Sequence, residues 1–339
     1  MSERAAADRH IPVMRDRCIA LLAQSVTTIQ HDGSRPVVID ATLGMGGHSE
    51  AMLAAHPDVT VLGIDRDTQA LELAAGRLER YGSRFRGVHA VYDQVDEVAK
   101  TLEPDQRLAG VLFDLGVSSL QLDEAERGFA YSYDAPLDMR MNAADDSPDE
   151  TAAQLLARVE ENELRRILSE YGEERFAGRI AKAIIRARQE SPLTTTSQLA
   201  AVVDSAVPAA AKRTGGHPAK RTFQAIRIAV NQELEVLRRA IPHALDALSL
   251  GGRIVVLSYH SLEDRIVKQA IAKRTTSSAP AGLPVELDEH KPTFSNVVRG
   301  AEPPTAEEIA ENPRAASAKL RAAEKIRQAK VPVTARSIA

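Results

Sequence analysis

Four short apolar runs rich in β-branched residues recur along this chain, and the first two end on an aspartate. They span residues 36–40, 59–65, 109–116 and 252–259, with a weaker run at 85–91. Continuous apolar runs of this length are typical of parallel strands covered on both faces. Helical patterns at 49–55 and 67–81 separate the first strands, so the sequence predicts βαβ units in a doubly wound α/β sheet. Right-handed crossovers would bring the carboxyl ends of these strands to one edge, where ligands bind.

The alternation stops after residue 116, and from about 150 to 249 the pattern is helical. One helix is expected over 195–207, with Thr196 or Ser197 as its N-cap, and Pro242 is expected to interrupt a later one. We predict a helical domain inserted into the sheet domain, leaving near residue 120 and returning near 240. Residues 312–330 hold six Lys or Arg and one Glu, which predicts a basic helix or a disordered arm.

Composition excludes several classes of protein. Lys and Arg number 43 and Asp and Glu 47, a net charge of −4, so any nucleic-acid surface must be a local patch. The single cysteine, Cys18, excludes an internal disulfide framework and a cysteine-rich zinc site. The charged N-terminus is not a secretory signal, and no apolar run approaches the ~20 residues that span a bilayer. We therefore expect a cytoplasmic protein with no membrane partner.

The first strand-to-helix junction, D-A-T-L-G-M-G-G-H-S (40–49), is the most informative motif. Its glycines let the backbone pass close to a ligand, and the helix that follows presents free N–H groups. Asp65 ends the next strand about 20 residues later, where a carboxylate accepts hydrogen bonds from ribose hydroxyls. This combination predicts an adenosine-type cofactor, although a turn that only packs helix on strand is the alternative.

The loop also discriminates between cofactors. The third glycine of the dinucleotide pattern G-x-G-x-x-G is absent, and Asp40 adds a negative charge beside the turn. That charge would repel a diphosphate and attract the sulfonium and amino groups of S-adenosylmethionine. We favour S-adenosylmethionine, with an NAD-dependent oxidoreductase as the alternative.

Two more strand ends carry candidate site residues. Asp114, in 113–123, could accept a hydrogen bond from an adenine edge or a substrate amine, and Gln121 could do either; a helix-capping turn is the alternative. His260, in 258–265, could act as a general base or an RNA contact, or be a hydrogen-bonded structural residue. Histidines and acids are too scattered to predict a metal site.

A basic strip lies within this acidic protein. From residue 205 to 232 there are five cationic residues and no acidic one. Contacts to phosphates and a solvated helix face explain this strip equally well. The cationic residues are Lys212, Arg213, Lys220, Arg221 and Arg227. A second cluster between residues 175 and 188 is interpreted as ordinary surface.

Taken together, these motifs resemble the family of bacterial ribosomal RNA small-subunit methyltransferases H, also called MraW. The resemblance covers most of residues 10–330 in order. It is carried by H-I-P-V-M (10–14), the 40–49 loop, G-I-D-R-D (63–67), D-L-G-V-S-S-L-Q-L-D (114–123), H-P-A-K-R-T-F-Q-A-I-R-I-A-V-N (217–231) and S-Y-H-S-L-E-D-R-I-V-K (258–268).

The resemblance implies a class I (Rossmann-like) S-adenosylmethionine-dependent methyltransferase sheet with an inserted all-helical domain. The methyltransferase domain would comprise residues 1–120 and 240–300, the helical substrate-recognition domain 121–239, and the basic tail 301–339. The implied activity is N4-methylation of one cytidine of 16S rRNA in the decoding region of the 30S subunit. A non-enzymatic RNA-binding assembly factor is a further alternative, and a homodimer is left open.

The resemblance also implies roles by position. Gly46, Gly47 and His48 match the family's cofactor loop, Asp65 its ribose-binding acid, and Asp114 and Gln121 further cofactor contacts. Tyr92 falls where the family places an aromatic near the adenine, and Leu120 replaces a usual proline.

For the chemistry, a group must accept the amino proton of a poorly nucleophilic cytosine amine as the C–N bond forms. Asp114 and the turn at Ser118 and Ser119 are the candidates, with His260 behind them. The base must leave its stack, and aromatic residues in 128–141 could receive it, with core packing as the alternative. These aromatics are Phe129, Tyr131 and Tyr133.

Overall fold

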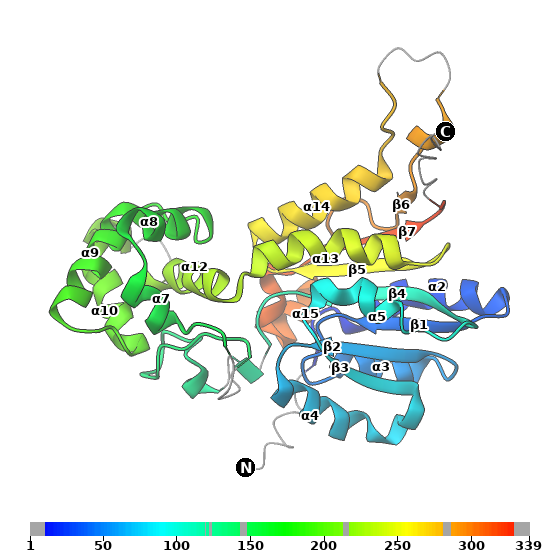
Figure 1. The fold of residues 1–339 in the computed structure, drawn as a ribbon, viewed down its shortest axis with the longest axis horizontal. Helices are drawn as coiled ribbons and strands as arrows, with labels where there is room; N and C mark the ends of the chain where they lie inside the picture. The colour runs from blue at the N-terminus through cyan, green and yellow to red at the C-terminus, as the bar shows by residue number, and fades with distance from the viewer. Residues whose placement is uncertain are drawn as a thin grey trace, which may run out of the picture. The chain divides into compact units, whose positions relative to one another are not determined.

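The computed structural model describes residues 11–118, 120–121, 124–142, 148–212, 217–280 and 286–328. Within these residues the chain forms two compact units (Figure 1). A sheet unit comprises residues 11–65, 71–116 and 237–328. A helical unit comprises residues 66–70 and 117–236.

The sheet unit contains a seven-stranded sheet in the order β3-β2-β1-β4-β5-β7-β6. The first five strands in this order are parallel, and β7 runs antiparallel to both β5 and β6. The predicted doubly wound class I sheet is therefore confirmed. The strands are β1 (Arg35–Asp40), β2 (Thr60–Asp65), β3 (Phe85–His89), β4 (Gln106–Asp114), β5 (Arg253–Ser258), β6 (Phe294–Asn296) and β7 (Lys319–Lys325).

Helices cover both faces of the sheet, which explains why its central strands are apolar without alternation. Val38 packs in one core cluster with residues of α2 and α3, whereas its neighbour Val37 packs in a second cluster with residues of α13 and α14. Successive strand residues point to opposite faces, and both valines are buried because helices cover both faces. The covering helices are α2 (Arg15–His31), α3 (Gly47–Ala55), α4 (Thr68–Leu78), α5 (Val95–Ala99), α13 (Glu233–Ala247) and α14 (Ser261–Thr275).

The helical unit contains α7 to α12, which confirms the helical pattern after residue 150. Thr195, rather than Thr196 or Ser197, is the N-cap of α10, because its side chain accepts a hydrogen bond from the Gln198 N–H. Thr196 is buried instead. The helices are α7 (Ala152–Arg158), α8 (Glu161–Glu170), α9 (Ala177–Glu190), α10 (Thr196–Ala206), α11 (Ala209–Lys212) and α12 (Ala219–Asn231).

Pro242 does not interrupt the chain as expected. It lies inside α13, which continues to Ala247. The break comes earlier, at Gln232, whose left-handed φ of 52° separates α12 from α13. A proline removes one backbone donor from a helix, and the apolar residues that α13 buries against the sheet hold the helix together in spite of that loss.

The expectation of a basic helix or disordered arm at 312–330 is wrong for residues 319–325, which form β7. Leu320 and Ala323 of β7 are buried in the cores on opposite faces of the sheet. Lys325 is 6% exposed, and its ammonium donates to the carbonyls of Asp246 and Leu248 at 2.9 and 2.8 Å. Burial lowers the pKa of this lysine. The ammonium group of Lys325 thus supplies hydrogen-bond donors to carbonyl groups at the end of α13, which have no partner within the helix.

Replacing this buried cation tests whether β7 belongs to the fold. Lys325→Met should lower the free energy of unfolding by about 2 kcal/mol, because buried carbonyls lose their donor. Urea denaturation measures the change. Lys319→Met is the matched control, since the Lys319 side chain in the same strand is 47% exposed, and it should leave the midpoint nearly unchanged. Equal effects of the two substitutions would contradict this role of Lys325.

Candidate active site

Polar residues collect at the carboxyl edge of the sheet because the five parallel strands end there. The register pairs Asp40 of β1 with Gly63 of β2 and with Leu112 of β4. Asp114, at the end of β4, pairs with Leu257 of β5. The groups that follow these strands therefore share one edge, as the sequence predicted.

The loop after β1 is bent by glycines, and α3 begins at its end. Gly44 and Gly46 adopt left-handed φ values of 50° and 78°. A Cβ at Gly46 would lie 3.1 Å from Leu78 Cδ1, and one at Gly47 would lie 2.4 Å from Pro12 Cγ. The sequence argument attributed these glycines to ligand approach; Gly46 and Gly47 are also required by packing against the chain itself.

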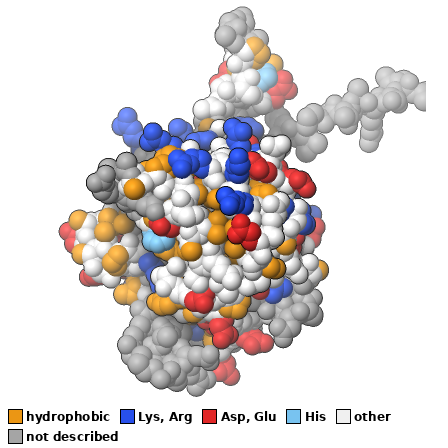
Figure 2. All heavy atoms as spheres, turned by 90° about the vertical axis from the view of Figure 1, so that its left-hand side faces the viewer, with side chains coloured by type: hydrophobic (Ala, Val, Ile, Leu, Met, Phe, Trp, Pro, Cys, Tyr) orange, Lys and Arg blue, Asp and Glu red, His pale blue; other side chains and the backbone are white. Residues whose placement is uncertain are grey.

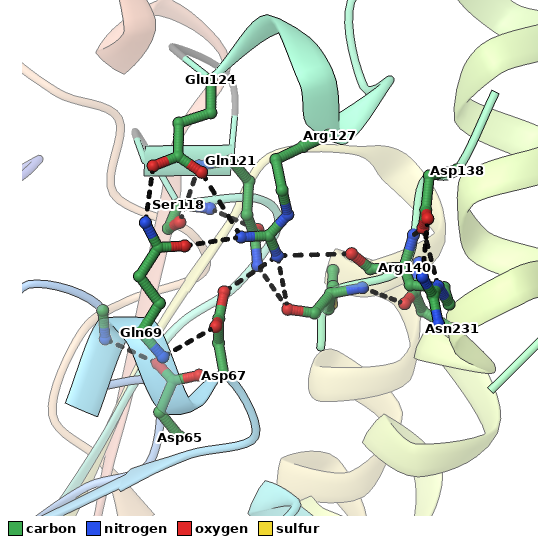
Figure 3. Close-up of polar contacts among 12 residues, drawn as sticks. Asp65, Asp67, Gln69, Ser118, Gln121, Glu124, Arg127, Asp138, Arg140 and Asn231 are labelled. Carbon is green, nitrogen blue, oxygen red and sulfur yellow. Dashed lines mark hydrogen bonds and ion pairs between the residues drawn. The ribbon is translucent and has the colours of Figure 1, made fainter. Parts of the chain in front are cut away.

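Asp65 lies against this loop. Its Oδ2 accepts a hydrogen bond from the Gly44 N–H at 2.8 Å (Figure 3). The glycine loop and the acid on the neighbouring strand are therefore brought together, as the spacing predicted. A carboxylate held next to a backbone turn is placed to accept from the vicinal hydroxyls of a ribose.

Asp40 and His48 are buried under the loop. Asp40, 2% exposed, accepts from Ser49 Oγ at 2.7 Å, and burial raises its pKa. His48, 5% exposed, has Nε2 3.1 Å from the Val13 carbonyl, and burial lowers its pKa. The open negative charge expected at Asp40 is therefore wrong, and both residues anchor the loop within the fold.

Asp114 is the centre of a hydrogen-bonded group at the end of β4. The Tyr259 hydroxyl donates to Asp114 Oδ1 at 2.6 Å, and the Asp114 N–H donates to Thr42 Oγ1 at 2.6 Å. His48 Nδ1 lies 3.8 Å from Asp114 Oδ2. Burial raises the pKa of Asp114 to about 7, against the opposing effect of the Tyr259 hydrogen bond. Its side chain nevertheless keeps 24% of its surface exposed, so an outside proton donor can reach it.

Tyr259 was missed by the sequence argument, although it lies in the motif S-Y-H-S that pointed to His260. From the sequence pattern alone, a tyrosine between a strand and a helix cannot be distinguished from an aromatic residue that packs in the core. Burial raises the pKa of Tyr259 well above its ordinary value, so it remains a hydrogen-bond donor to Asp114.

His260 lies at the N-terminus of α14, next to Glu263. Its Nε2 is 3.2 Å from Glu263 Oε1, yet neither ring nitrogen makes an aligned hydrogen bond within the described residues. Glu263 Oε2 instead accepts from the backbone N–H groups of Tyr259 and His260, at 2.8 and 3.2 Å. Glu263 thus fixes the turn that carries both side chains.

Tyr92 follows β3 in a short 3-10 helix, Tyr92–Gln94. Its ring meets Phe113 edge-on, with ring centroids 5.8 Å apart. Because β3 pairs with β2 up to Asp65, Tyr92 lies near the same edge of the sheet. Contact with an adenine stays a prediction.

Ser118 and Gln121 belong to the helical unit and bind each other. The Ser118 N–H donates to Gln121 Oε1 at 3.0 Å, and the Gln121 N–H donates to Ser118 Oγ at 3.2 Å. Gln121 is 6% exposed, and its Nε2 lies 3.4 Å from the Met141 carbonyl. These bonds order the turn, while contact with a cofactor or a substrate stays a prediction. Ser119 lies outside the described residues.

A buried cation organises the neighbouring part of the helical unit (Figure 3). Arg127, 7% exposed, donates to Asp67 Oδ2 at 2.9 Å and to the Met141 carbonyl at 2.8 Å. Asn231, at the end of α12, accepts from the Met141 N–H at 2.7 Å and donates to the Met139 carbonyl at 2.7 Å. This network holds three separate segments together and was not predicted from the sequence.

Lys220 and Arg221 of the basic strip are exposed in the first turn of α12. Arg221 Nη1 donates to the Glu173 carbonyl at 3.2 Å. Both cations are therefore at the surface, as a phosphate contact requires.

Arg227 differs from the rest of the strip. Its guanidinium binds both oxygens of Glu233, at 2.8 and 2.9 Å, and the two side chains are 15% and 8% exposed. Arg227 was predicted as an RNA contact; its charge is instead neutralised within the fold. The side chain of Lys212 and the whole of Arg213 lie outside the described residues.

The aromatics of 128–141 divide into packed and exposed residues. Phe129 is buried, and Tyr131 stacks on His217 with centroids 4.4 Å apart. Tyr133 is 60% exposed. Core packing thus accounts for Phe129, whereas Tyr133 is accessible to a base.

In the part of the chain that the structure describes, no group of His, Cys, Asp and Glu side chains could hold a metal ion. Among the same residues, no helix has the length and apolarity needed to cross a membrane.

The raised pKa of Asp114 predicts a pH-dependent stability. The folded protein keeps a proton up to about pH 7 that the unfolded chain releases near pH 3.9. The stabilisation is therefore complete below pH ~4 and is lost as pH rises through ~7. As pH rises from about 4 to about 7, the free energy of unfolding should fall less for Asp114→Asn than for the wild type. Urea denaturation at a series of pH values measures the change.

Asp105→Asn is the matched control. The hydrogen bond from Arg35 lowers the pKa of Asp105, so this substitution should change the pH dependence of stability only below the range in which Asp114 acts. Parallel stability curves for Asp114→Asn and the wild type would contradict the raised pKa.

Comparison with known proteins agrees with this geometry. The model of the MraW methylase family matches residues 7–326. The chain is 60% identical to the ribosomal RNA small subunit methyltransferase H of Pseudarthrobacter chlorophenolicus, over 96% of this chain and 97% of that protein. Proteins of the same name from Renibacterium salmoninarum and Kocuria rhizophila are 59% and 55% identical, over 95% and 99% of this chain and 96% and 100% of theirs. Neither the NAD-dependent oxidoreductase nor the non-enzymatic assembly factor gains support.

The residues at the sheet edge fit a methyl donor of nucleoside type. Asp65 and the glycine loop offer an acceptor and backbone N–H groups, and residues 40–49 contain no Lys or Arg that would repel a sulfonium. The chain is thus a methyltransferase that uses S-adenosylmethionine, and it belongs to the MraW methylase family.

Proposed function

We propose that this protein methylates the N4 amino group of one cytidine of 16S rRNA in the decoding region of the 30S subunit, in the cytoplasm. The observation that carries the proposal is the Asp114 carboxyl group at the carboxyl edge of the sheet, which accepts from the Tyr259 hydroxyl while the Asp114 backbone N–H donates to Thr42. It supplies a proton acceptor one strand away from the glycine loop. The printed name of the relatives, ribosomal RNA small subunit methyltransferase, supports the choice of substrate class.

For the cofactor, we assign the ribose hydroxyls to Asp65 and the adenine to the neighbourhood of Tyr92. Gly44, Gly46 and Gly47 shape the loop, and His48 holds it to the segment before α2 through Val13. When bound, S-adenosylmethionine supplies an electrophilic methyl group on a positively charged sulfur.

The chemistry asks two things of the protein. The lone pair of the cytosine amine is delocalised into the ring, so the amine must be held in line with the methyl group and the sulfur. The nitrogen–carbon bond forms as the carbon–sulfur bond breaks, and one amino proton passes to the Asp114 carboxylate. A pKa of about 7 suits this transfer, because a useful fraction of the group is ionised at neutral pH and it holds the proton it receives.

Within the described residues the ring nitrogens of His260 make no aligned hydrogen bond, and His260 directly follows Tyr259, the hydrogen-bond partner of Asp114. We therefore place it behind Asp114 as a reserve acceptor, not as the main one. Ser118, four residues after Asp114, remains a proposed contact to the substrate.

We assign substrate recognition to the helical domain, predicted at 121–239. Lys220 and Arg221 would contact phosphates, and the exposed ring of Tyr133 would stack on a base.

The acceptor role predicts the behaviour of two variants. Asp114→Asn should lower kcat about 10²–10⁴-fold, because an amide cannot take the proton. Tyr259→Phe keeps the carboxylate but removes its donor, so kcat should fall less and the pH–rate profile should shift. Methyl incorporation from labelled S-adenosylmethionine into 30S subunits that lack the modification measures both. Unchanged kcat in Asp114→Asn would refute the role.

The ribose contact predicts a loss of cofactor affinity. Asp65→Ala should raise the Kd for S-adenosylmethionine at least about tenfold, in line with the loss of charge-assisted hydrogen bonds. Isothermal titration calorimetry measures it. Asp58→Ala, an exposed aspartate just before the same strand, is the control and should bind like the wild type. Equal affinities in both variants would remove Asp65 from the site.

A further inference from the structure

The first two turns of α12 contact the turn at residues 171–174, which joins α8 to α9 in the helical unit. Arg221 Nη1 donates to the Glu173 carbonyl at 3.2 Å, and Gln224 Nε2 donates to the Tyr171 carbonyl at 3.0 Å. A Cβ at Gly172 would lie 2.7 Å from the Arg221 carbonyl oxygen, so only glycine permits this approach. Two segments whose contacting residues are 48 and 53 positions apart in the sequence thus become neighbours.

Exposed cations from three helices surround this junction. Arg175 precedes α9, and Arg179 and Lys182 lie in its first two turns. Lys220 and Arg221 lie in the first turn of α12. From α8, the exposed Arg165 reaches the start of α9, with Nε 3.8 Å from the position of a Cβ on Gly178.

The cations of α9 and α12 lie at or near the N-terminal ends of their helices, which is the unfavourable end for a positive charge. A helix N-terminus carries a partial positive charge that favours acidic side chains. The first turns of α9 and α12 contain no acidic residue. The neighbouring α8 follows the usual pattern, since it begins with Glu161 and Glu163. Placing cations where helix dipoles oppose them favours an anion from outside.

The fold itself does little to neutralise the group. Within the described residues, no carboxylate forms an ion pair with Arg175, Arg179 or Lys182. Glu174 is 9% exposed, and its Oε1 accepts from the Phe176 N–H at 2.8 Å. Glu173 is the exposed acid at the turn. By contrast, Arg166 of α8 is paired with Glu163 and Glu170 at 2.6 and 2.7 Å.

We propose that this basic surface binds the phosphate backbone of ribosomal RNA. It consists of Arg165, Arg175, Arg179, Lys182, Lys220 and Arg221. The inference rests on the proposed function and extends it to α8 and α9, whose cluster the sequence analysis interpreted as ordinary surface. Figure 2, which faces the helical unit, shows Lys and Arg side chains gathered on its upper part. Backbone contacts position an RNA without reading its sequence.

The test is the salt dependence of methyl transfer into 30S subunits that lack the modification. The variant Arg175→Gln/Arg179→Gln/Lys182→Gln should raise KM for the subunit at least about tenfold, with kcat and the Kd for S-adenosylmethionine nearly unchanged. The slope of log kcat/KM against log salt should become shallower by about 2 to 3, one unit for each lost phosphate contact.

Two controls separate charge from fold. Arg166→Gln removes a cation of α8 that the fold already neutralises, so it should behave like the wild type. Arg175→Lys/Arg179→Lys keeps the charge and should keep most of the affinity. A triple variant with wild-type KM and wild-type salt slope would overturn the inference.

Failure of the proposed function gives a different result. If the wild type transfers no methyl group to the subunit, the assignment of substrate fails. Filter binding of 16S rRNA then tests the surface without turnover. Weaker, less salt-dependent binding by the triple variant supports the inference, and equal binding overturns it.

Discussion

The parallel register of β1 with its two neighbours sets Asp40 beside Gly63 on one side and Leu112 on the other. From that pairing follow the contact of Gly44 with Asp65 and the approach of Thr42 to Asp114. A slip of one residue would turn every side chain of β1 to the opposite face. Val37 and Val38 are buried in separate cores on the two faces, and the pairing of β1 with β4 shifts register between them.

The burial that secures this register also sets the chemistry. A carboxyl group in water is ionised at neutral pH, whereas Asp114 is held between Tyr259, Thr42 and His48 and ionises near pH 7. The hydrogen bond from the Tyr259 hydroxyl limits the rise in the pKa of Asp114 but does not cancel it. The carboxyl group of Asp114, at the end of β4, can thus both accept and release a proton near neutral pH.

Much of the sheet and of the cofactor edge could be predicted from the sequence. Apolar runs ending on polar residues indicate parallel strands, and the spacing from the glycine loop to Asp65 indicates their adjacency. The strand at 319–325 could not be predicted in this way. Its residues favour a helix, and pairing with β5 and burial of Leu320 outweigh that local preference.

The same limit applies to individual charges. Asp40 and Arg227 looked like exposed functional groups, but burial and the partner Glu233 assign them to the fold. Conversely, Tyr259 was not predicted as a site residue, yet its hydroxyl donates to Asp114. Whether a polar side chain is free depends on tertiary neighbours, which a one-dimensional pattern does not contain. The contact of α12 with the turn at 171–174 depends on tertiary neighbours in the same way.

In the proposed function, Asp65 binds the ribose of the methyl donor at one edge of the sheet, and the sulfur of the donor lies on the Asp114 side. A crystal structure with S-adenosylhomocysteine tests this most directly. The account predicts ribose hydroxyls within hydrogen-bond distance of the Asp65 carboxylate and the sulfur on the Asp114 side of the glycine loop. A ligand whose ribose makes no contact with Asp65, or one bound away from the ends of β1, β2 and β4, would contradict it.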